Sequence, residues 1–156
     1  MITSGEPPQA EDPPQPRISY VVARLERAIR KAINAQVRPY GLTTLQYTTL
    51  SVLGARGELS NAQLARRAYM TPQSMSEVID ALQARGLVER STLPHHRRVF
   101  PATLTAQGRE VLAACDEAVA AVEQKMLADL GPDEQRILRD GLLKAVRALH
   151  AGFPEH

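Results

Sequence analysis

The residues with the clearest chemistry in this sequence are Gln73, Ser74 and Ser76, which follow Thr71 and Pro72. The Thr71 hydroxyl can cap the free amides of a helix start, and proline at the first helical position has no N–H to leave unpaired. The three polar residues then lie on the exposed first turns of that helix. A Gln amide can pair with the edge of adenine, whereas Ser tolerates several bases. This spacing predicts a helix whose N-terminal end reads base edges in a DNA groove.

Boundary signals predict the elements that hold this helix in place. Ser60 followed by Gln63 is a capping-box pattern, so we expect a shorter helix to begin there. Gly86 ends the reading helix, because glycine tolerates the left-handed conformation found just past a helix end. The apolar positions that form the buried face of the reading helix recur at helical spacing: Met75, Val78, Ile79 and Leu82.

A hairpin is predicted after Gly86, with strands at residues 87–91 and 98–104 and a turn at residues 93–96. Pro101 has no amide donor, which favours an edge position for the second strand. Two helices and a hairpin in this order predict a mainly α-helical winged helix-turn-helix with a small two- or three-stranded β-wing. An ordinary helical hairpin with an attached β-ribbon is the alternative, and it would not require these boundary signals in this order.

Basic charge is concentrated around the predicted reader. Residues 17–112 contain 14 Lys and Arg against 6 Asp and Glu, although the net charge of the whole chain is only +2. This asymmetry suits phosphate binding, while the alternative is charge scattered over a solvated surface. The reading helix carries Glu77 and Asp80, so phosphate contacts must come mostly from its neighbours. The candidates are Arg66, Arg67, Arg90, Arg97 and Arg98.

Composition excludes several other classes of protein. A chain of 156 residues with 44% hydrophobic residues can bury one core of ordinary size. Aromatic residues make up 4% and tryptophan is absent, so stacking platforms for single-stranded nucleic acid are not expected. No apolar stretch is long enough to cross a bilayer, and the N-terminus has no secretory-signal pattern, so we expect a cytoplasmic location. The single cysteine, Cys115, excludes an internal disulfide.

The segments on either side of the reader predict how the chain is organised. Residues 1–16 contain five prolines and three acids, which predicts a disordered tail. We expect an N-terminal dimerisation helix within residues 17–42, the DNA-binding region at 43–105, and C-terminal dimerisation helices within 106–156.

These outer helices are apolar on more than one side, and in a chain this small a second copy is the simplest partner for the extra surface. A twofold dimer would also place paired helix-turn-helix units on half-sites about one helical turn apart. A monomeric bundle that buries the same residues internally is the alternative. Predicted helix starts are Thr43 or Thr44, Thr105 and Gly131.

Several local stretches, taken together, resemble the MarR family of bacterial transcription regulators. The resemblance runs from about Ile18 to Leu149 and is carried by Gly41-Leu42-Thr43 with Gln46, Thr71-Pro72-Gln73-Ser74, Gly86-Leu87-Val88-Glu89-Arg90, Arg97-Arg98, and Thr103-Leu104-Thr105 with Gly108. It implies a homodimer joined by its first and last helices. It also implies a repressor that binds double-stranded DNA at a pseudopalindrome, usually near the regulator's own promoter, with relief by a small-molecule effector or an oxidant.

The resemblance assigns base contacts to Gln73, Ser74 and Ser76, and a phosphate contact to Thr71. The wing arginine that enters the minor groove would be Arg97 or Arg98. The family commonly has an acid just before these arginines, and this chain has His96. A neutral histidine cannot hold the arginine by a charge-assisted bond, so it is either a phosphate contact when protonated or a turn residue without a role.

The sequence says less about sensing. Tyr40 and Tyr47 are the candidates for an effector site, together with Tyr20, and each also fits a core or junction aromatic. Cys115 lies on an apolar helix stripe, where a thiol is usually inert packing. No cofactor or metal site is expected, because the histidines lack ligand partners at helical spacing. No catalytic constellation stands out, and a protein-interaction module on a winged-helix scaffold remains the alternative function.

Overall fold

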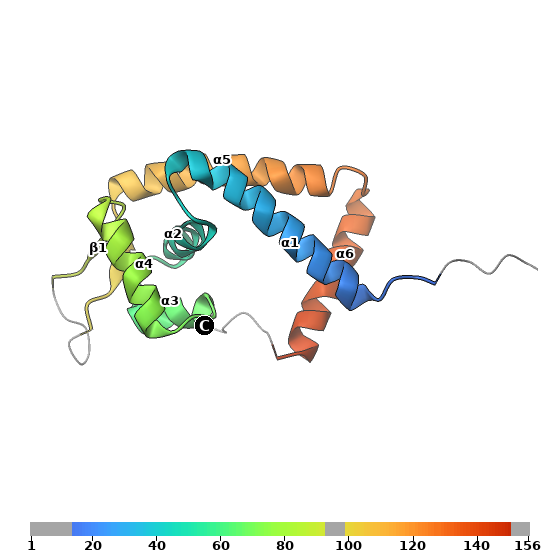
Figure 1. Cartoon of the computed structure of the whole chain (residues 1–156), viewed down its shortest axis with the longest axis horizontal. Coiled ribbons are helices and arrows are strands. Elements are labelled where there is room, and N and C mark those ends of the chain that lie inside the picture. Colours follow the sequence, from blue (N-terminus) through green and yellow to red (C-terminus); the bar gives the residue numbers. More distant parts are fainter. Residues whose placement is uncertain (1–13, 93–98, 151–156) are drawn as a thin grey trace, which may run out of the picture.

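The computed structural model describes residues 14–92 and 99–150 and is mainly helical, as predicted (Figure 1). The elements, in chain order, are α1 (Ile18–Val37), a 3-10 turn η1 (Arg38–Tyr40), α2 (Thr44–Arg56), α3 (Asn61–Arg67), α4 (Pro72–Ala84), β1 (Val88–Arg90), β2 (Ala102–Leu104), α5 (Ala106–Met126) and α6 (Pro132–Ala148). This order confirms the winged helix-turn-helix fold. Residues 93–98, which hold the predicted turn, lie outside the described residues.

Side-chain caps define the helix starts at the predicted positions. In each case a hydroxyl oxygen accepts a hydrogen bond from the backbone N–H three residues later, which satisfies one of the free amides of the first turn. The bonds are Thr43 to Gln46 at 3.1 Å, Ser60 to Gln63 at 3.2 Å, Thr71 to Ser74 at 3.1 Å and Thr105 to Gly108 at 2.9 Å. Gly86 follows α4 with φ +70°, as the predicted stop requires.

The core lies where α2, α3, α4 and the small sheet meet. Met75, Ile79 and Leu82 are fully buried on the inner face of α4, as their helical spacing predicts. Leu50 and Leu53 of α2 join the same apolar cluster. This packing fixes the orientation of α4 and therefore of its opposite, polar face.

The sheet is antiparallel and shorter than predicted. Its register pairs Val88 with Leu104 and Arg90 with Ala102. Pro101 lies immediately before β2 and not within it, although its carbonyl still accepts a hydrogen bond from the Ser91 N–H at 2.9 Å. Leu59 pairs with Ala102 from the other side, so three chain segments meet at the base of the wing.

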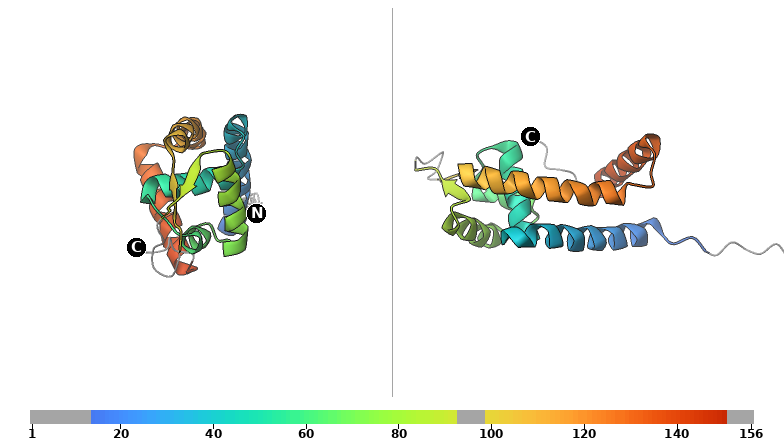
Figure 2. Two further views of the ribbon diagram at one scale, coloured as in Figure 1. Left: turned by 90° about the vertical axis from the view of Figure 1, so that its left-hand side faces the viewer. Right: turned by 90° about the horizontal axis from the view of Figure 1, so that it is seen from above.

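Long helices extend away from the unit formed by α2, α3, α4 and the small sheet. Helices α1 and α5 pack against each other and run side by side in opposite directions, with α6 at their far end (Figure 2). Helix α5 ends at Met126, and residues 127–130 form a turn in which the Leu130 N–H bonds to the Leu127 carbonyl. None of the described helices combines the length and the apolarity needed to cross a bilayer.

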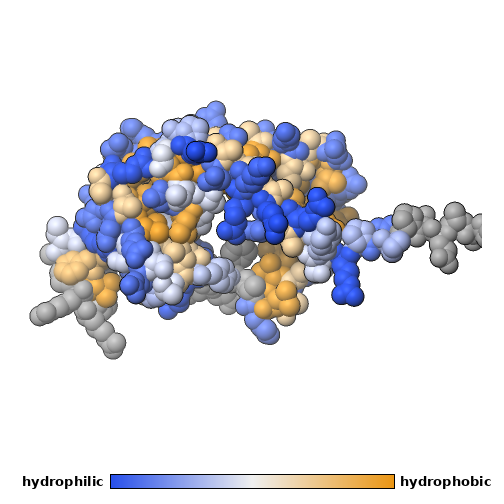
Figure 3. All heavy atoms as spheres, viewed as in Figure 1, coloured by the Kyte–Doolittle hydropathy of each residue, from blue (hydrophilic) through white to orange (hydrophobic). Residues whose placement is uncertain are grey.

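Helix α6 leaves apolar side chains uncovered. It has no buried residue among those described; Ile137 within it is 67% exposed, and Leu149, directly after it, is 80% exposed. An apolar patch lies over α6 on the face shown in Figure 3. At the N-terminal end of α1, Ile18 is 81% exposed. Exposed apolar surface of this kind marks an interaction site.

Candidate DNA-binding interface

The predicted reader is built from α3, a tight turn and the N-terminal half of α4. The Thr71 hydroxyl caps α4 and donates a hydrogen bond of 2.9 Å to the Ser74 hydroxyl oxygen. The Asn61 side chain at the start of α3 donates a hydrogen bond of 2.7 Å to the Pro72 carbonyl. These two contacts fix the start of α4 to its own first turn and to α3, so the polar end of the helix is held in one orientation.

The predicted base-reading residues lie on the outer side of this helix start. Gln73 is exposed, while Ser74 and Ser76 are half-buried. Met75, which lies between Ser74 and Ser76 in the chain, is fully buried. A helix that buries Met75 and exposes Gln73 presents the side-chain amide of Gln73 to a ligand that approaches its N-terminal end.

Two of the predicted phosphate contacts lie at the end of α3. Arg66 is exposed, and Arg67 is half-buried with its guanidinium 3.4 Å from the Gln63 carbonyl. Both precede the turn into α4, so the positive charge lies beside the helix start that carries Gln73. Positive charge at this place is what a site for a DNA backbone requires.

Arg90 lies in a different environment. Its guanidinium forms an ion pair with Asp80 of α4 at 3.2 Å, and its side chain is only 26% exposed. The pair links β1 to the reading helix, so Arg90 is held by a carboxylate where the sequence predicts a phosphate contact. Sequence reasoning missed this pair, because the two residues belong to different elements and only their packing brings them together.

Arg97, Arg98 and His96 lie outside the described residues. Val99 and Phe100, which come directly after them, are 38% and 43% exposed. The prediction that a wing arginine enters the minor groove stays a prediction.

The two tyrosines predicted for an effector site lie at junctions. The Tyr47 hydroxyl of α2 donates a hydrogen bond of 2.8 Å to Asp116 of α5. Burial, followed by this bond and the charge of Asp116, raises the pKa of Tyr47 far above its ordinary value. The carbonyls of Tyr40 and Gly41 accept hydrogen bonds from Arg85, at 2.7 and 2.8 Å. Tyr47 therefore joins two helices, and the Tyr40 backbone joins the α1–α2 corner to the end of α4.

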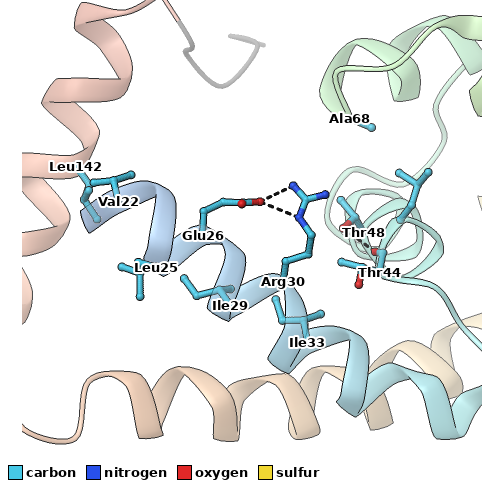
Figure 4. A pocket seen from close by; sticks show the side chains of 11 residues that line it. Val22, Leu25, Glu26, Ile29, Arg30, Ile33, Thr44, Thr48, Ala68 and Leu142 are labelled. Atoms are coloured by element: carbon cyan, nitrogen blue, oxygen red, sulfur yellow. Dashed lines mark hydrogen bonds and ion pairs between the residues drawn. The ribbon is translucent and has the colours of Figure 1, made fainter. Parts of the chain in front are cut away.

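An apolar cavity of about 460 Å³ lies elsewhere, between α1, α2 and α6 (Figure 4). Val22, Leu25, Ile29 and Ile33 of α1 contribute most of its apolar wall, and Thr44 and Thr48 of α2 lie at one side. Glu26 and Arg30 form an ion pair at its opening. Tyr40 and Tyr47 are not among its lining residues. The apolar stripe and the i,i+4 charge pair on α1 were visible in the sequence, but the second wall comes from distant segments.

Cys115 of α5 is fully buried in the apolar core. Burial raises the pKa of its thiol, and the neighbouring Asp116 carboxylate raises it further. Both effects reduce the thiolate fraction that oxidants attack. This agrees with the predicted packing role.

Comparison with known proteins assigns the chain to a family. A model described as MarR family matches residues 40–99, which run from η1 into the wing. The HTH-type transcriptional repressor Rv2887 of Mycobacterium tuberculosis is 35% identical over 127 residues, which cover 81% of this chain and 89% of the relative. The chain belongs to the MarR family.

Solved structures of MarR family proteins agree with this assignment. The crystal structure of Rv2887 in complex with DNA is 32% identical, covers 84% of this chain and 98% of that chain, and gives a TM-score of 0.70. The crystal structure of Rv2887 in complex with p-aminosalicylic acid is 34% identical, covers 83% and 98%, and gives a TM-score of 0.68. The wild-type MarR of E. coli, at 19% identity and a TM-score of 0.73 over 85% of this chain and 99% of that chain, shares the fold.

Proposed function

We propose that this MarR family chain is a transcriptional repressor that binds double-stranded DNA as a homodimer. The observation that carries the proposal is the start of α4, where a capped helix held by Asn61 exposes Gln73 beside Arg66. The relative Rv2887, named a transcriptional repressor, has been crystallised with DNA. We expect binding, and not catalysis, to be the activity of the chain, and we place it in the cytoplasm.

In the proposed complex, α4 enters the major groove of each half-site. Gln73 reads a base edge, and Ser74 and Ser76 make permissive contacts. The phosphate contacts, which orient the helix without reading sequence, come from Thr71, Arg66, Arg67, Arg90 and one of the wing arginines, Arg97 or Arg98.

Selection of duplexes from a random-sequence pool tests the reading helix. The wild-type chain is expected to select a pseudopalindrome whose half-sites are about one helical turn apart. The Gln73→Ala variant should lose preference at one base pair of each half-site and keep the others. The matched control is Gln83→Ala, a change of the same residue type in the last turn of α4. An unchanged consensus for Gln73→Ala would remove Gln73 from base reading.

The exposed apolar side chains of α1 and α6 support the homodimer. We place one dimerisation segment within residues 17–42 and the other within 106–156, with the DNA-binding region at 43–105. Light scattering should give a dimer for the wild-type chain and a monomer for Ile137→Glu, because burying an unpaired carboxylate in the dimer interface is costly. Arg139→Glu, which changes an already polar exposed position, should remain dimeric. A dimeric Ile137→Glu would place the interface elsewhere.

The cavity between α1, α2 and α6 supports regulation by a small-molecule effector with an apolar body and a carboxylate. The apolar wall of α1 suits such a body, and Arg30 offers a cation at the opening once it leaves Glu26. The probe is p-aminosalicylate, which is bound in a crystal structure of Rv2887.

Two variants with opposite expected effects on p-aminosalicylate affinity test this effector site. Arg30→Gln should weaken p-aminosalicylate binding, and Glu26→Gln should strengthen it because the competing carboxylate is gone. Arg27→Gln, which changes an arginine outside the cavity lining, is the control. If Tyr47→Phe instead abolishes binding while both α1 variants do nothing, the site involves Tyr47 and, with it, the predicted Tyr40 region.

One observation favours a second candidate, a protein-interaction module on a winged-helix scaffold. Asp80 forms an ion pair with Arg90, and Glu77 is exposed on the reading helix, so the exposed face of α4 is less basic than its surroundings. Failure to select any duplex at low salt, with a dimer still formed, would favour this function.

A further inference from the structure

Arg85 joins the end of the reading helix to the corner between α1 and α2. It follows directly after the last residue of α4. Its guanidinium donates a hydrogen bond of 2.7 Å to the Tyr40 carbonyl and another of 2.8 Å to the Gly41 carbonyl. Gly41 has φ +70°, and a Cβ there would lie only 3.3 Å from the guanidinium. Two charged hydrogen bonds from one planar group hold the helix end and the corner in a defined geometry.

The same corner connects the two walls of the apolar cavity. On one side Ile33 lines the cavity, one turn before α1 ends at the fully buried Val37. On the other side Thr44 and Thr48 line it, and both belong to α2, which begins shortly after the corner (Figure 4). A ligand that moves α1 away from α2 must therefore also move the backbone between them, which includes the two carbonyls that Arg85 holds.

These two bonds tolerate little displacement. A donor and an acceptor more than about 3.5 Å apart no longer form a hydrogen bond, so a shift of roughly 1 Å at the corner is enough to break both. The apolar core would still hold the buried face of α4 through Met75, Ile79 and Leu82. The C-terminal end of α4, however, would lose its link to the corner, and the helix could turn about its buried face.

Arg85 lies far from the base-reading end of α4. It is 12 positions after Gln73 in the chain, which corresponds to about 18 Å along a helix. Its guanidinium is bonded to backbone carbonyls of the corner. An effect of Arg85 on DNA binding is therefore expected to come from the orientation of α4 and not from a contact beside Gln73.

We propose that Arg85 couples the cavity to the reading helix. A ligand between α1 and α2 shifts the corner, Arg85 loses the two carbonyls, and α4 leaves the orientation that reads DNA. The bonded arrangement is the one that binds DNA, and Arg85 is a positioning residue that touches neither the ligand nor the duplex. The proposal rests on the proposed function, both for the cavity as effector site and for α4 as reader.

Calorimetry of p-aminosalicylate binding to the full chain without DNA gives the first test. In Arg85→Gln the ligand no longer has to break the two bonds, so this variant should bind p-aminosalicylate about tenfold more tightly, the fold-change that corresponds to a hydrogen bond from a charged group. Arg85→Lys, which keeps the charge and a donor, should lie between wild type and Arg85→Gln. A residue with only a structural role would not tighten binding in a cavity that it does not line.

The second test is anisotropy of a duplex that the wild-type chain selects from a random-sequence pool, with and without saturating p-aminosalicylate. Coupling between two ligands is reciprocal, so p-aminosalicylate should weaken wild-type binding to the duplex about tenfold. Arg85→Gln should bind the duplex several-fold more weakly than wild type and should change less than twofold with p-aminosalicylate. Its slope of log affinity against log salt should match wild type, because Arg85 contacts no phosphate.

Arg109→Gln is the matched control. Arg109 also donates a hydrogen bond to a backbone carbonyl, that of Leu104 at 3.1 Å, but both residues belong to one short stretch of chain. The variant loses the same charge and should bind p-aminosalicylate and the duplex like wild type.

Wild-type affinity of Arg85→Gln for p-aminosalicylate, or a wild-type response of its DNA binding, would overturn the coupling and leave the proposed function intact. A salt slope reduced by about 0.9 would make Arg85 a phosphate contact and would also overturn it. A wild-type chain that binds its duplex regardless of p-aminosalicylate would overturn the coupling and the proposed effector site, but not the proposed DNA binding. A wild-type chain that selects no duplex would overturn all three.

Discussion

The Asp80–Arg90 pair offers a sharp test of how the reading helix and the wing work together. The Asp80 carboxylate of α4 holds the Arg90 guanidinium of β1 at 3.2 Å, with side-chain exposures of 66% and 26%. When DNA binds, we expect the Arg90 guanidinium to leave the Asp80 carboxylate and contact a DNA phosphate. Asp80→Asn releases Arg90 in advance, whereas Arg90→Gln removes the guanidinium and leaves Asp80.

The effect on folding should be small. A partly exposed ion pair contributes about 0–1 kcal/mol, so Asp80→Asn should lower the free energy of unfolding by roughly 0.5 kcal/mol and the melting temperature by ~2 °C. The effect on DNA binding should be larger and opposite in sign. A freed guanidinium adds one charged hydrogen bond, for which a net of roughly 1 kcal/mol corresponds to about fivefold tighter binding. Loss of the carboxylate charge itself, at ~10 Å from a phosphate in water, adds on the order of 0.4 kcal/mol before screening.

The assay is anisotropy of a labelled duplex over a salt series for wild type, both single variants and the double variant. Each phosphate contact contributes about 0.9 to the slope of log affinity against log salt. Arg90→Gln should therefore reduce the magnitude of this slope by about that amount. In the Arg90→Gln background, Asp80→Asn should leave the slope unchanged and should change the affinity only by the small effect of removing the Asp80 charge. If Asp80→Asn and Arg90→Gln both bind DNA as wild type does, Arg90 does not meet DNA and the pair only fastens β1 to α4.

Three further predictions concern the scaffold. Gly108→Ala should destabilise the fold by about 1–3 kcal/mol in urea unfolding, because a Cβ there would overlap the Leu87 carbonyl; Gly141→Ala, with open space around it, should be neutral or stabilising. Since the folded pKa of Tyr47 is raised, its contribution to stability is complete below about pH 10 and declines as the pH rises above that value; Tyr47→Phe should flatten this decline, and an unchanged profile would contradict the assignment. Cys115 should react with iodoacetamide at pH 8 at least about tenfold more slowly in the folded chain than in urea, and equal rates would show that it is accessible.

Local signals in the sequence were enough to predict most of this fold. The caps at Ser60, Thr71 and Thr105 depend on a side chain and an amide three residues away, so both partners lie within one short stretch. The buried face of α4 follows from helical periodicity in the same way. Such features need no knowledge of tertiary packing, which is why the order of elements could be predicted.

Contacts between distant segments could not be predicted. The Asp80–Arg90 pair depends on how β1 packs beside α4, and Arg85 reaches carbonyls 44 and 45 residues away. The cavity has walls from α1, α2 and α6, and only the stripe on α1 is visible in the sequence. The left-handed conformation of Tyr69 was also hidden, because sequence reasoning expects glycine or asparagine at such a turn.

Titration of wild-type chain into the duplex upstream of its gene and into a scrambled duplex, over a salt series, tests the central claim most directly. The account predicts binding that is at least about a thousandfold tighter for the upstream duplex and that weakens steeply with salt as several phosphate contacts are lost. Equal affinity for the upstream duplex, the scrambled duplex and a duplex selected from a random pool would contradict sequence-specific reading by α4. No binding to any of the three at low salt would contradict DNA binding altogether.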